Sequence, residues 1–217
     1  MINNWIYTNT VDNKARFVLG EKGKKTLVCM GINPSTATPD KLDRTLNTVK
    51  RFSHDLGYDS WIMLNLYPQR STNPNNLDQK NNIDYHKENL KQITKILKNK
   101  NCDLWAAWGT LIEKREYLFD CLVDIYNISK LGSVKWYTIG KKSKKGHPHH
   151  PLYLNRNLKI EIFDIENYLN NMTKIKKKCL CDNPTCAKCL LINCEDDNCK
   201  IHTKRRKKEF KLKYRNR

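Results

Sequence analysis

Residues 26–36 of the chain are TLVCMGINPST. The first six residues form an apolar run of strand length, and the polar turn that follows contains Asn33 and Pro34. A short apolar run bounded by turn residues is typical of a buried strand in a parallel sheet. This stretch therefore predicts the first parallel strand of an α/β sheet, with a loop of unusual composition at its carboxyl end.

The same combination of apolar run and polar loop recurs three more times. Further strands are predicted at 60–66, 102–108 and 134–139, and helices at 41–56, 84–97, 111–126 and 162–169. Residues 5–8 and 16–19 can form a β element before the first of these strands. Strict alternation of strands and helices implies right-handed crossovers and a sheet covered on both faces. We therefore expect a three-layer α/β sandwich with a four-stranded, mostly parallel sheet.

Each predicted strand is followed at once by a loop rich in polar residues, glycine or proline. Ligands of open α/β sheets bind outside the carboxyl ends of the strands, so four such loops predict a shared crevice. The alternative is a set of ordinary turns, in which these residue types are common. The candidate substrate-binding residues are Gly31, Pro34, Ser35, Asp43, Asn65, Arg70, Thr72, Trp108 and Gly109. For Arg70 a surface salt bridge, and for Trp108 a place in the core, are the alternative interpretations.

The loop motifs, taken together, resemble a known family. Residues 31–45 (GINPSTATPDKLDRT), 65–77 (NLYPQRSTNPNNL), 105–109 (WAAWG) and 146–154 (GHPHHPLYL) are similar to the domain-of-unknown-function family numbered 1643. Its members have GLNPSTA, DDPT, NLFAYRAT, AAWG and GxPxHPLYL in the same order, and the resemblance covers about residues 5–155. Leu42 and Arg44 depart from the DDPT motif, and the run 141–145 is an insertion. The family implies no activity.

A more distant resemblance suggests a chemistry. The Gly-x-Asn-Pro turn after the first strand and the His-Pro turn after the last are similar to two motifs of the uracil-DNA glycosylase superfamily. This resemblance implies that Asn33 positions a hydrolytic water and that His150, or alternatively His147, contacts the base. The segment 65–77 would be the loop that recognises the base, which a glycosylase holds in a pocket outside the stack. Ser35 departs from the glycine of the mismatch-specific branch.

A different hydrolytic chemistry is open for the same residues. Ser35, His150 and Asp43 have the side chains of a catalytic triad, although the chain has no Gly-x-Ser-x-Gly turn. A further alternative is a non-catalytic crevice that is vestigial or binds a free nucleotide.

The composition changes near residue 170, which predicts a domain of residues 1–170 and a tail of residues 171–217. The tail contains 15 Lys or Arg against 5 Asp or Glu, a net charge of +10. It also contains soft metal ligands at short spacings: Cys179, Cys181, Cys186, Cys189, Cys194, Cys199 and His202. Zinc takes four such ligands, so we expect the tail to bind zinc. The alternative is a Cys-rich basic tail without metal.

The chain has a formal net charge of +19 over 217 residues, which indicates a polyanionic partner. Nucleic acid is the usual one, with DNA and RNA both open, and an anionic membrane surface is the alternative. The sequence lacks a signal-peptide core and any stretch long enough to span a membrane, so an intracellular location and reduced cysteines are expected. The primary hypothesis is a nucleic-acid-associated protein with a base- or nucleotide-binding pocket, which could act as a glycosylase-like hydrolase. The alternatives are a non-catalytic nucleic-acid-binding module and an interaction protein that acts through the tail.

Overall fold

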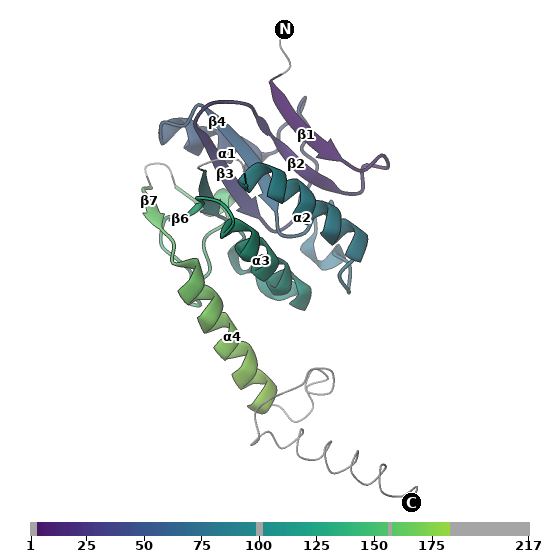
Figure 1. Cartoon of the computed structure of the whole chain (residues 1–217), viewed down its shortest axis with the longest axis vertical. Helices are drawn as coiled ribbons and strands as arrows, with labels where there is room; N and C mark the ends of the chain where they lie inside the picture. The colour runs from purple at the N-terminus through teal and green to yellow at the C-terminus, as the bar shows by residue number, and fades with distance from the viewer. Residues whose placement is uncertain (1–3, 99–101, 156–157, 183–217) are drawn as a thin grey trace, which may run out of the picture. The chain divides into compact units, whose positions relative to one another are not determined.

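A computed structural model describes residues 4–98, 102–155 and 158–182 (Figure 1). The chain divides into two compact units, Met1–Ile165 and Glu166–Arg217. The first unit is a mixed α/β domain that contains all the loops identified in the sequence. In the second unit, the described residues belong to helix α4 (Ile165–Asp182). None of the helices in the described ranges is long and apolar enough to cross a lipid bilayer.

One seven-stranded sheet forms the centre of the first unit, in the order β1-β2-β4-β3-β5-β6-β7. The strands are β1 (Trp5–Asn9), β2 (Arg16–Glu21), β3 (Thr26–Gly31), β4 (Ser60–Asn65), β5 (Asp103–Ala106), β6 (Lys135–Ile139) and β7 (Ile160–Ile162). The strands β4, β3, β5 and β6 are parallel to one another. They correspond to the four strands predicted from the sequence.

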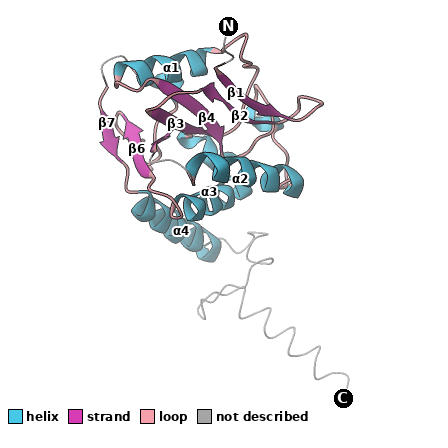
Figure 2. Cartoon of the chain, turned by 45° about the horizontal axis from the view of Figure 1, so that its top comes forward, coloured by secondary structure: helices cyan, strands magenta, loops and turns pink. Residues whose placement is uncertain are grey.

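Helices lie on both faces of the sheet (Figure 2). Helix α1 (Arg44–Asp55) covers one face, and α2 (Ile83–Leu97) and α3 (Glu116–Ser129) cover the other. Three short 3₁₀ helices, η1 (Pro74–Asn76), η2 (Gly109–Lys114) and η3 (Pro151–Tyr153), lie in the loops. The predicted helices at 41–56 and 84–97 are confirmed with small changes at their ends.

Helix α1 shows why the sequence forms this layer. Asp43 is its N-cap, and the carboxylate accepts a hydrogen bond from the Leu46 N–H at 2.9 Å. The apolar residues recur at helical spacing, so one face of the helix carries Leu46, Val49 and Phe52 into the core. There the Phe52 ring meets Trp105 of β5 edge to face, with the ring centroids 5.6 Å apart.

The sheet is wider than the four strands predicted, because antiparallel strands extend it on both sides. β1 and β2 pair with each other and β2 pairs with β4, while the three-residue β7 pairs with β6. Residues 160–162 are too few to show a period in the sequence, which is why the prediction began a helix at 162. The predicted helix at 111–126 is interrupted at Arg115, whose backbone is extended and separates η2 from α3.

The connections define where a ligand would enter the fold. From β3 the chain passes to β4 on one side, and β5 then returns to the opposite side of β3. In open α/β sheets, the crevice at such a reversal of strand order is the usual ligand site. The loops that follow β3 and β5 lie on either side of this point.

Candidate functional site

A cavity of about 430 Å³ opens at the carboxyl ends of the parallel strands. Residues that follow each of the four parallel strands line it, together with the first turn of α1. The lining residues are Arg16, Gly31, Ile32, Asn33, Ser35, Asp43, Arg44, Thr45, Leu46, Met63, Ser71, Thr72, Pro74, Leu111, His150, Leu152 and Tyr153. Six residues predicted from the sequence, Gly31, Asn33, Ser35, Asp43, Thr72 and His150, are therefore brought together.

Four other predicted residues lie behind the cavity wall. Pro34 is buried, and its carbonyl accepts hydrogen bonds from Asn33 and Ser71. Asn65 pairs with Gly31 across the strand ends, and a Cβ on Gly31 would lie 3.0 Å from the Asn65 Oδ1. Neither amide atom of the fully buried Asn65 side chain has a hydrogen-bond partner in the described part of the chain. The other two, Arg70 and Gly109, support loops that form the wall.

Asn33 is held in one orientation by the loop after β4. Its Nδ2 donates to the carbonyl oxygens of Pro34 at 2.9 Å, Ser71 at 2.9 Å and Gln69 at 3.4 Å. Because these acceptors can be served only by the amide nitrogen, the assignment of Nδ2 and Oδ1 follows from the hydrogen bonds. The Oδ1 is left as an acceptor on a residue that lines the cavity. Such an acceptor can orient a water molecule or a donor group of a ligand.

His150 contributes a hydrogen-bond donor, whereas Asn33 contributes an acceptor. Its Nδ1 accepts a hydrogen bond from the Leu152 N–H at 3.3 Å, so the neutral ring carries its proton on Nε2. Burial lowers the pKa of His150 below its ordinary value, although the nearby Asp43 carboxylate opposes the shift. At neutral pH the imidazole is therefore uncharged and can donate from Nε2.

Gly109 lets the turn after β5 pack closely against the loop after β6, which carries His150. It has a φ of +64°, which favours glycine, and its N–H donates to the Pro148 carbonyl at 3.0 Å. A Cβ at this position would lie 3.4 Å from the Cβ of His150. The turn after β5 thus packs directly against the loop after β6.

The geometry does not assemble a serine triad. Ser35, Asp43 and His150 line the same cavity, but no hydrogen bond joins any two of them among the described residues. Asp43 caps α1, and the His150 Nδ1 is occupied by the Leu152 N–H. A triad needs the histidine bonded both to the nucleophile and to the carboxylate.

Arg70 supports the loop after β3 from behind. Its guanidinium donates to the carbonyl oxygens of Ser35 and Ala37 and, at 2.8 Å, to the Tyr7 hydroxyl. It forms no ion pair with any carboxylate in the described ranges. The surface salt bridge considered from the sequence does not describe this role. Arg70 does not line the cavity, and its contact with a ligand stays a prediction.

Arg16 is a cavity residue that sequence reasoning missed. The pairing of β1 with β2 shifts between Thr8 and Asn9, so that Asn9 is opposite Arg16 and Phe17 is passed over. Irregularities of this kind re-aim side chains next to functional sites. The side chain of Arg16 is only 2% exposed, and its position in the cavity wall has no signal in the apolar pattern of β2.

Two of the predicted residues do not reach the cavity. Trp108 is fully buried and packs edge to face on Trp136 and Phe163, with centroid distances of 6.1 and 5.9 Å. His147 is also fully buried, and its Nε2 lies 3.0 Å from the Glu113 Oε1. Trp108 thus occupies the core, and His147 links the loop after β6 to η2.

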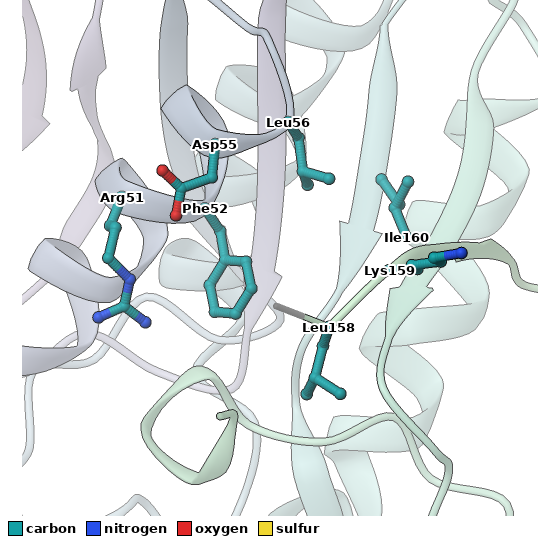
Figure 3. Close-up of a pocket in the computed structure, with 7 residues that line it drawn as sticks. All are labelled: Arg51, Phe52, Asp55, Leu56, Leu158, Lys159 and Ile160. Carbon is teal, nitrogen blue, oxygen red and sulfur yellow. The ribbon is translucent and has the colours of Figure 1, made fainter. Parts of the chain in front are cut away.

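A second cavity of about 680 Å³ lies near the end of α1 (Figure 3). It is lined by Arg51, Phe52, Asp55, Leu56, Leu158, Lys159 and Ile160. None of the site residues predicted from the sequence borders it.

The predicted metal ligands cannot be compared with the structure. Cys179 and Cys181 belong to the last turn of α4, whose side chains are not described. Cys186, Cys189, Cys194, Cys199 and His202 lie outside the described residues. Within the described ranges, no group of three or more His, Cys, Asp or Glu side chains is arranged to hold a metal ion.

The fold and the cavity define an α/β protein with a polar pocket at the strand ends. The chain belongs to the family described as proteins of unknown function, DUF1643, whose model matches residues 16–152. The match confirms the family resemblance of the loop motifs, and it includes every cavity residue except Tyr153. No curated protein and no solved structure matched the chain.

Proposed function

We propose that the chain is a nucleic-acid-associated protein whose cavity binds a base or nucleotide and hydrolyses its N-glycosidic bond. The fold would then be a three-layer sandwich of the uracil-DNA-glycosylase type. The observation that carries the proposal is the fixed orientation of Asn33, whose Nδ2 is held by three carbonyl oxygens while Oδ1 remains an acceptor.

The two polar groups have complementary roles in this reaction. The Asn33 Oδ1 accepts a hydrogen bond from the water whose oxygen forms the new bond to the sugar C1′. The bond from C1′ to the base nitrogen breaks, and the departing base gains negative charge that a neutral His150 Nε2–H stabilises. The base finally takes the proton that the attacking water releases. A neutral imidazole is suited to this task because it can donate at neutral pH.

The cavity wall also suits a planar ligand. Tyr153 is 78% exposed and Leu152 is 46% exposed, and both line the cavity beside His150. The ring centroids of His150 and Tyr153 lie 6.0 Å apart. An exposed aromatic ring next to polar groups offers a stacking surface for a base that has left its duplex.

An excision assay tests the proposal. The full chain is incubated with duplex and single-stranded oligonucleotides that carry uracil, mismatched thymine or damaged bases, and alkaline cleavage reveals abasic sites. We expect Asn33→Ala to reduce excision by roughly a hundredfold or more, as when one positioned polar group is lost from an active site. Asn47→Ala is the matched control, because Asn47 is exposed, its side chain donates only to the Leu42 carbonyl and it does not line the cavity.

The outcomes separate catalysis from binding. Absence of excision with every substrate excludes the hydrolytic function. Excision that persists in folded Asn33→Ala removes Asn33 from the mechanism. Thermal unfolding of each variant shows whether it is folded, since Asn33 also holds the loop after β4. Nucleic-acid binding without excision would instead support the non-catalytic module.

The association with nucleic acid rests on the charge of the chain, +19 overall with +10 in residues 171–217. Binding that depends on phosphate contacts weakens steeply as salt concentration rises, because bound counterions are released. We expect affinity for a DNA or RNA oligonucleotide to fall by at least roughly a hundredfold between 50 and 200 mM salt. Affinity that does not change with salt would contradict this model.

A further inference from the structure

Arg16 is a buried positive charge without an ion-pair partner. Its side chain is 2% exposed, and no carboxylate in the described ranges lies within 4.0 Å of it. Of its nitrogens only Nη1 donates a hydrogen bond, to the Ala37 carbonyl at 3.1 Å, while Nε and Nη2 donate to no described residue. A buried charge is expensive unless it is paired and its donors are satisfied.

The surroundings of Arg16 add positive charge and do not supply the missing acceptors. Burial, followed by the neighbouring Arg70 guanidinium, lowers the pKa of Arg16 to about 10, and Asp43 only partly opposes this. Among the cavity residues, two guanidinium groups, Arg16 and Arg44, stand against one carboxylate, Asp43. Since one carboxylate oxygen of Asp43 already accepts the Leu46 N–H, the wall carries an excess of donors and of positive charge.

The first turn of α1 contributes further donors to the same wall. Arg44 and Thr45 line the cavity as the first two residues of this twelve-residue helix. Backbone N–H groups at these positions have no partner within the helix, and the helix dipole makes them favourable for an anion. Arg44 is exposed and adds a positive charge at the rim of the cavity.

We propose that Arg16 and the first turn of α1 form an anion subsite of the cavity that binds the phosphate group of a nucleotide. This proposal rests on the proposed function in one respect: the part of the ligand other than the phosphate is taken to be a base, which the rest of the wall suits. Other residues of the wall are neutral or apolar and include Leu111, Leu152 and Tyr153. A phosphate on a nucleoside accepts hydrogen bonds from the Arg16 Nη2 and from the first turn of α1, while its base occupies the neutral part of the cavity. The phosphate could come from a free nucleotide or from a phosphodiester of nucleic acid.

Calorimetric titration of the full chain at constant ionic strength tests the subsite. The probes are thymidine, thymidine 5′-monophosphate and a thymidine dinucleotide with one phosphodiester. We expect at least one phosphorylated probe to bind at least about tenfold more tightly than thymidine, as for a charge-assisted hydrogen bond. The better of the two phosphorylated probes identifies the source of the phosphate.

Variants assign the preference to Arg16. The quantity compared is the affinity for the better phosphorylated probe divided by the affinity for thymidine. Arg16→Gln should reduce this ratio to about one. Arg44→Gln, which changes an exposed residue, should reduce it by about two- to fivefold. Arg51→Gln is the matched control, since Arg51 lies on the same helix but borders the second cavity (Figure 3). Because the basic tail is unchanged in all variants, its own affinity for phosphate cancels in the comparison. If Arg16→Gln does not fold, Arg44→Gln decides.

The results distinguish this proposal from the proposed function. Equal binding of thymidine and both phosphorylated probes by the wild type, or a ratio that neither Arg16→Gln nor Arg44→Gln reduces, overturns the subsite. Absence of base excision together with a phosphate preference that depends on Arg16 leaves the subsite in place and removes only the hydrolytic function.

Discussion

The guanidinium groups of Arg16 and Arg70 donate to the same oxygen, the carbonyl of Ala37, at 3.1 and 3.2 Å. Arg16 begins β2, whereas Arg70 belongs to the loop after β4. Both therefore hold the loop after β3 from different parts of the sheet. Such shared contacts explain how an irregular loop can present Asn33 in one orientation, since a positioned side chain needs a rigid support.

Replacing Arg70 by lysine should destabilise the domain by about 1–3 kcal/mol. A single ammonium group cannot reach the Ser35 carbonyl, the Ala37 carbonyl and the Tyr7 hydroxyl in the planar arrangement that the guanidinium provides. Denaturant unfolding measures the change. Tyr7→Phe removes only one of the three bonds and should cost less, about 1 kcal/mol. Equal stability of Arg70→Lys and the wild type would show that the loop does not depend on this contact.

Replacing His150 by asparagine should make the stability of the domain less dependent on pH. Burial lowers the pKa of folded His150 below the value of about 6.5 of the unfolded chain, so the unfolded state takes up its proton first. This contribution to stability is present above pH 6.5 and is lost as the pH falls through the folded pKa. The asparagine Oδ1 can still accept the Leu152 N–H, so the cap of η3 is kept.

The measurement for His150 is the change in free energy of unfolding between pH 8 and pH 5.5. The wild type should lose more stability over this interval than His150→Asn. His54→Asn, at an exposed position outside the cavity, serves as the comparison and should behave as the wild type. An identical pH dependence in all three proteins would contradict the buried, neutral state assigned to His150.

Replacing Glu113 by alanine should cost about 1–2 kcal/mol, because it removes the acceptor beside the fully buried His147. Burial alone would raise the pKa of Glu113, but hydrogen bonds from Lys145 and His147 outweigh it and lower the pKa. The carboxylate therefore stabilises the fold above its unfolded pKa, and this effect disappears as the pH falls through the lower folded value. Unfolding at pH 7 and at pH 3.5 checks both statements.

Lys145→Ala is the control for Glu113, since it removes only an exposed partner of the same carboxylate. The Lys145 side chain is 63% exposed, and ion pairs of this kind contribute less than about 1 kcal/mol. If Lys145→Ala is as destabilising as Glu113→Ala, the buried imidazole is not the reason for the loss.

Cysteine alkylation should separate the domain from the tail. Cys29, Cys102 and Cys121 are buried, and burial raises the pKa of Cys121 to about 12, so these thiols should resist iodoacetamide in the folded protein. The six cysteines of residues 171–217 should react in reduced, metal-free protein and become protected when zinc is added. Mass spectrometry of the peptides gives the pattern. Unchanged reactivity with zinc would contradict the zinc-binding tail.

Much of the architecture could be predicted from the chain because buried parallel strands and amphipathic helices have clear periods. The strand Thr26–Gly31 and the helix beginning after Asp43 follow from apolar runs, a capping residue and a polar turn. The three-residue β7 could not be predicted, because it depends on pairing with β6 and not on its own pattern. The break at Arg115 likewise follows from hydrogen bonds that its side chain makes to the carbonyls of Leu77 and Asp78.

For the site, the sequence alone determined which loops follow the parallel strands, and that Asn33 and His150 belong to two of them. Strand direction makes this predictable, since parallel strands bring their carboxyl ends to one edge. Only the tertiary structure decided which side chains enter the cavity. It placed Trp108 in the core, and it placed Arg16 in the cavity wall, beside an irregularity in the pairing of β1 with β2. Such choices depend on contacts between residues far apart in the chain, which no local pattern encodes.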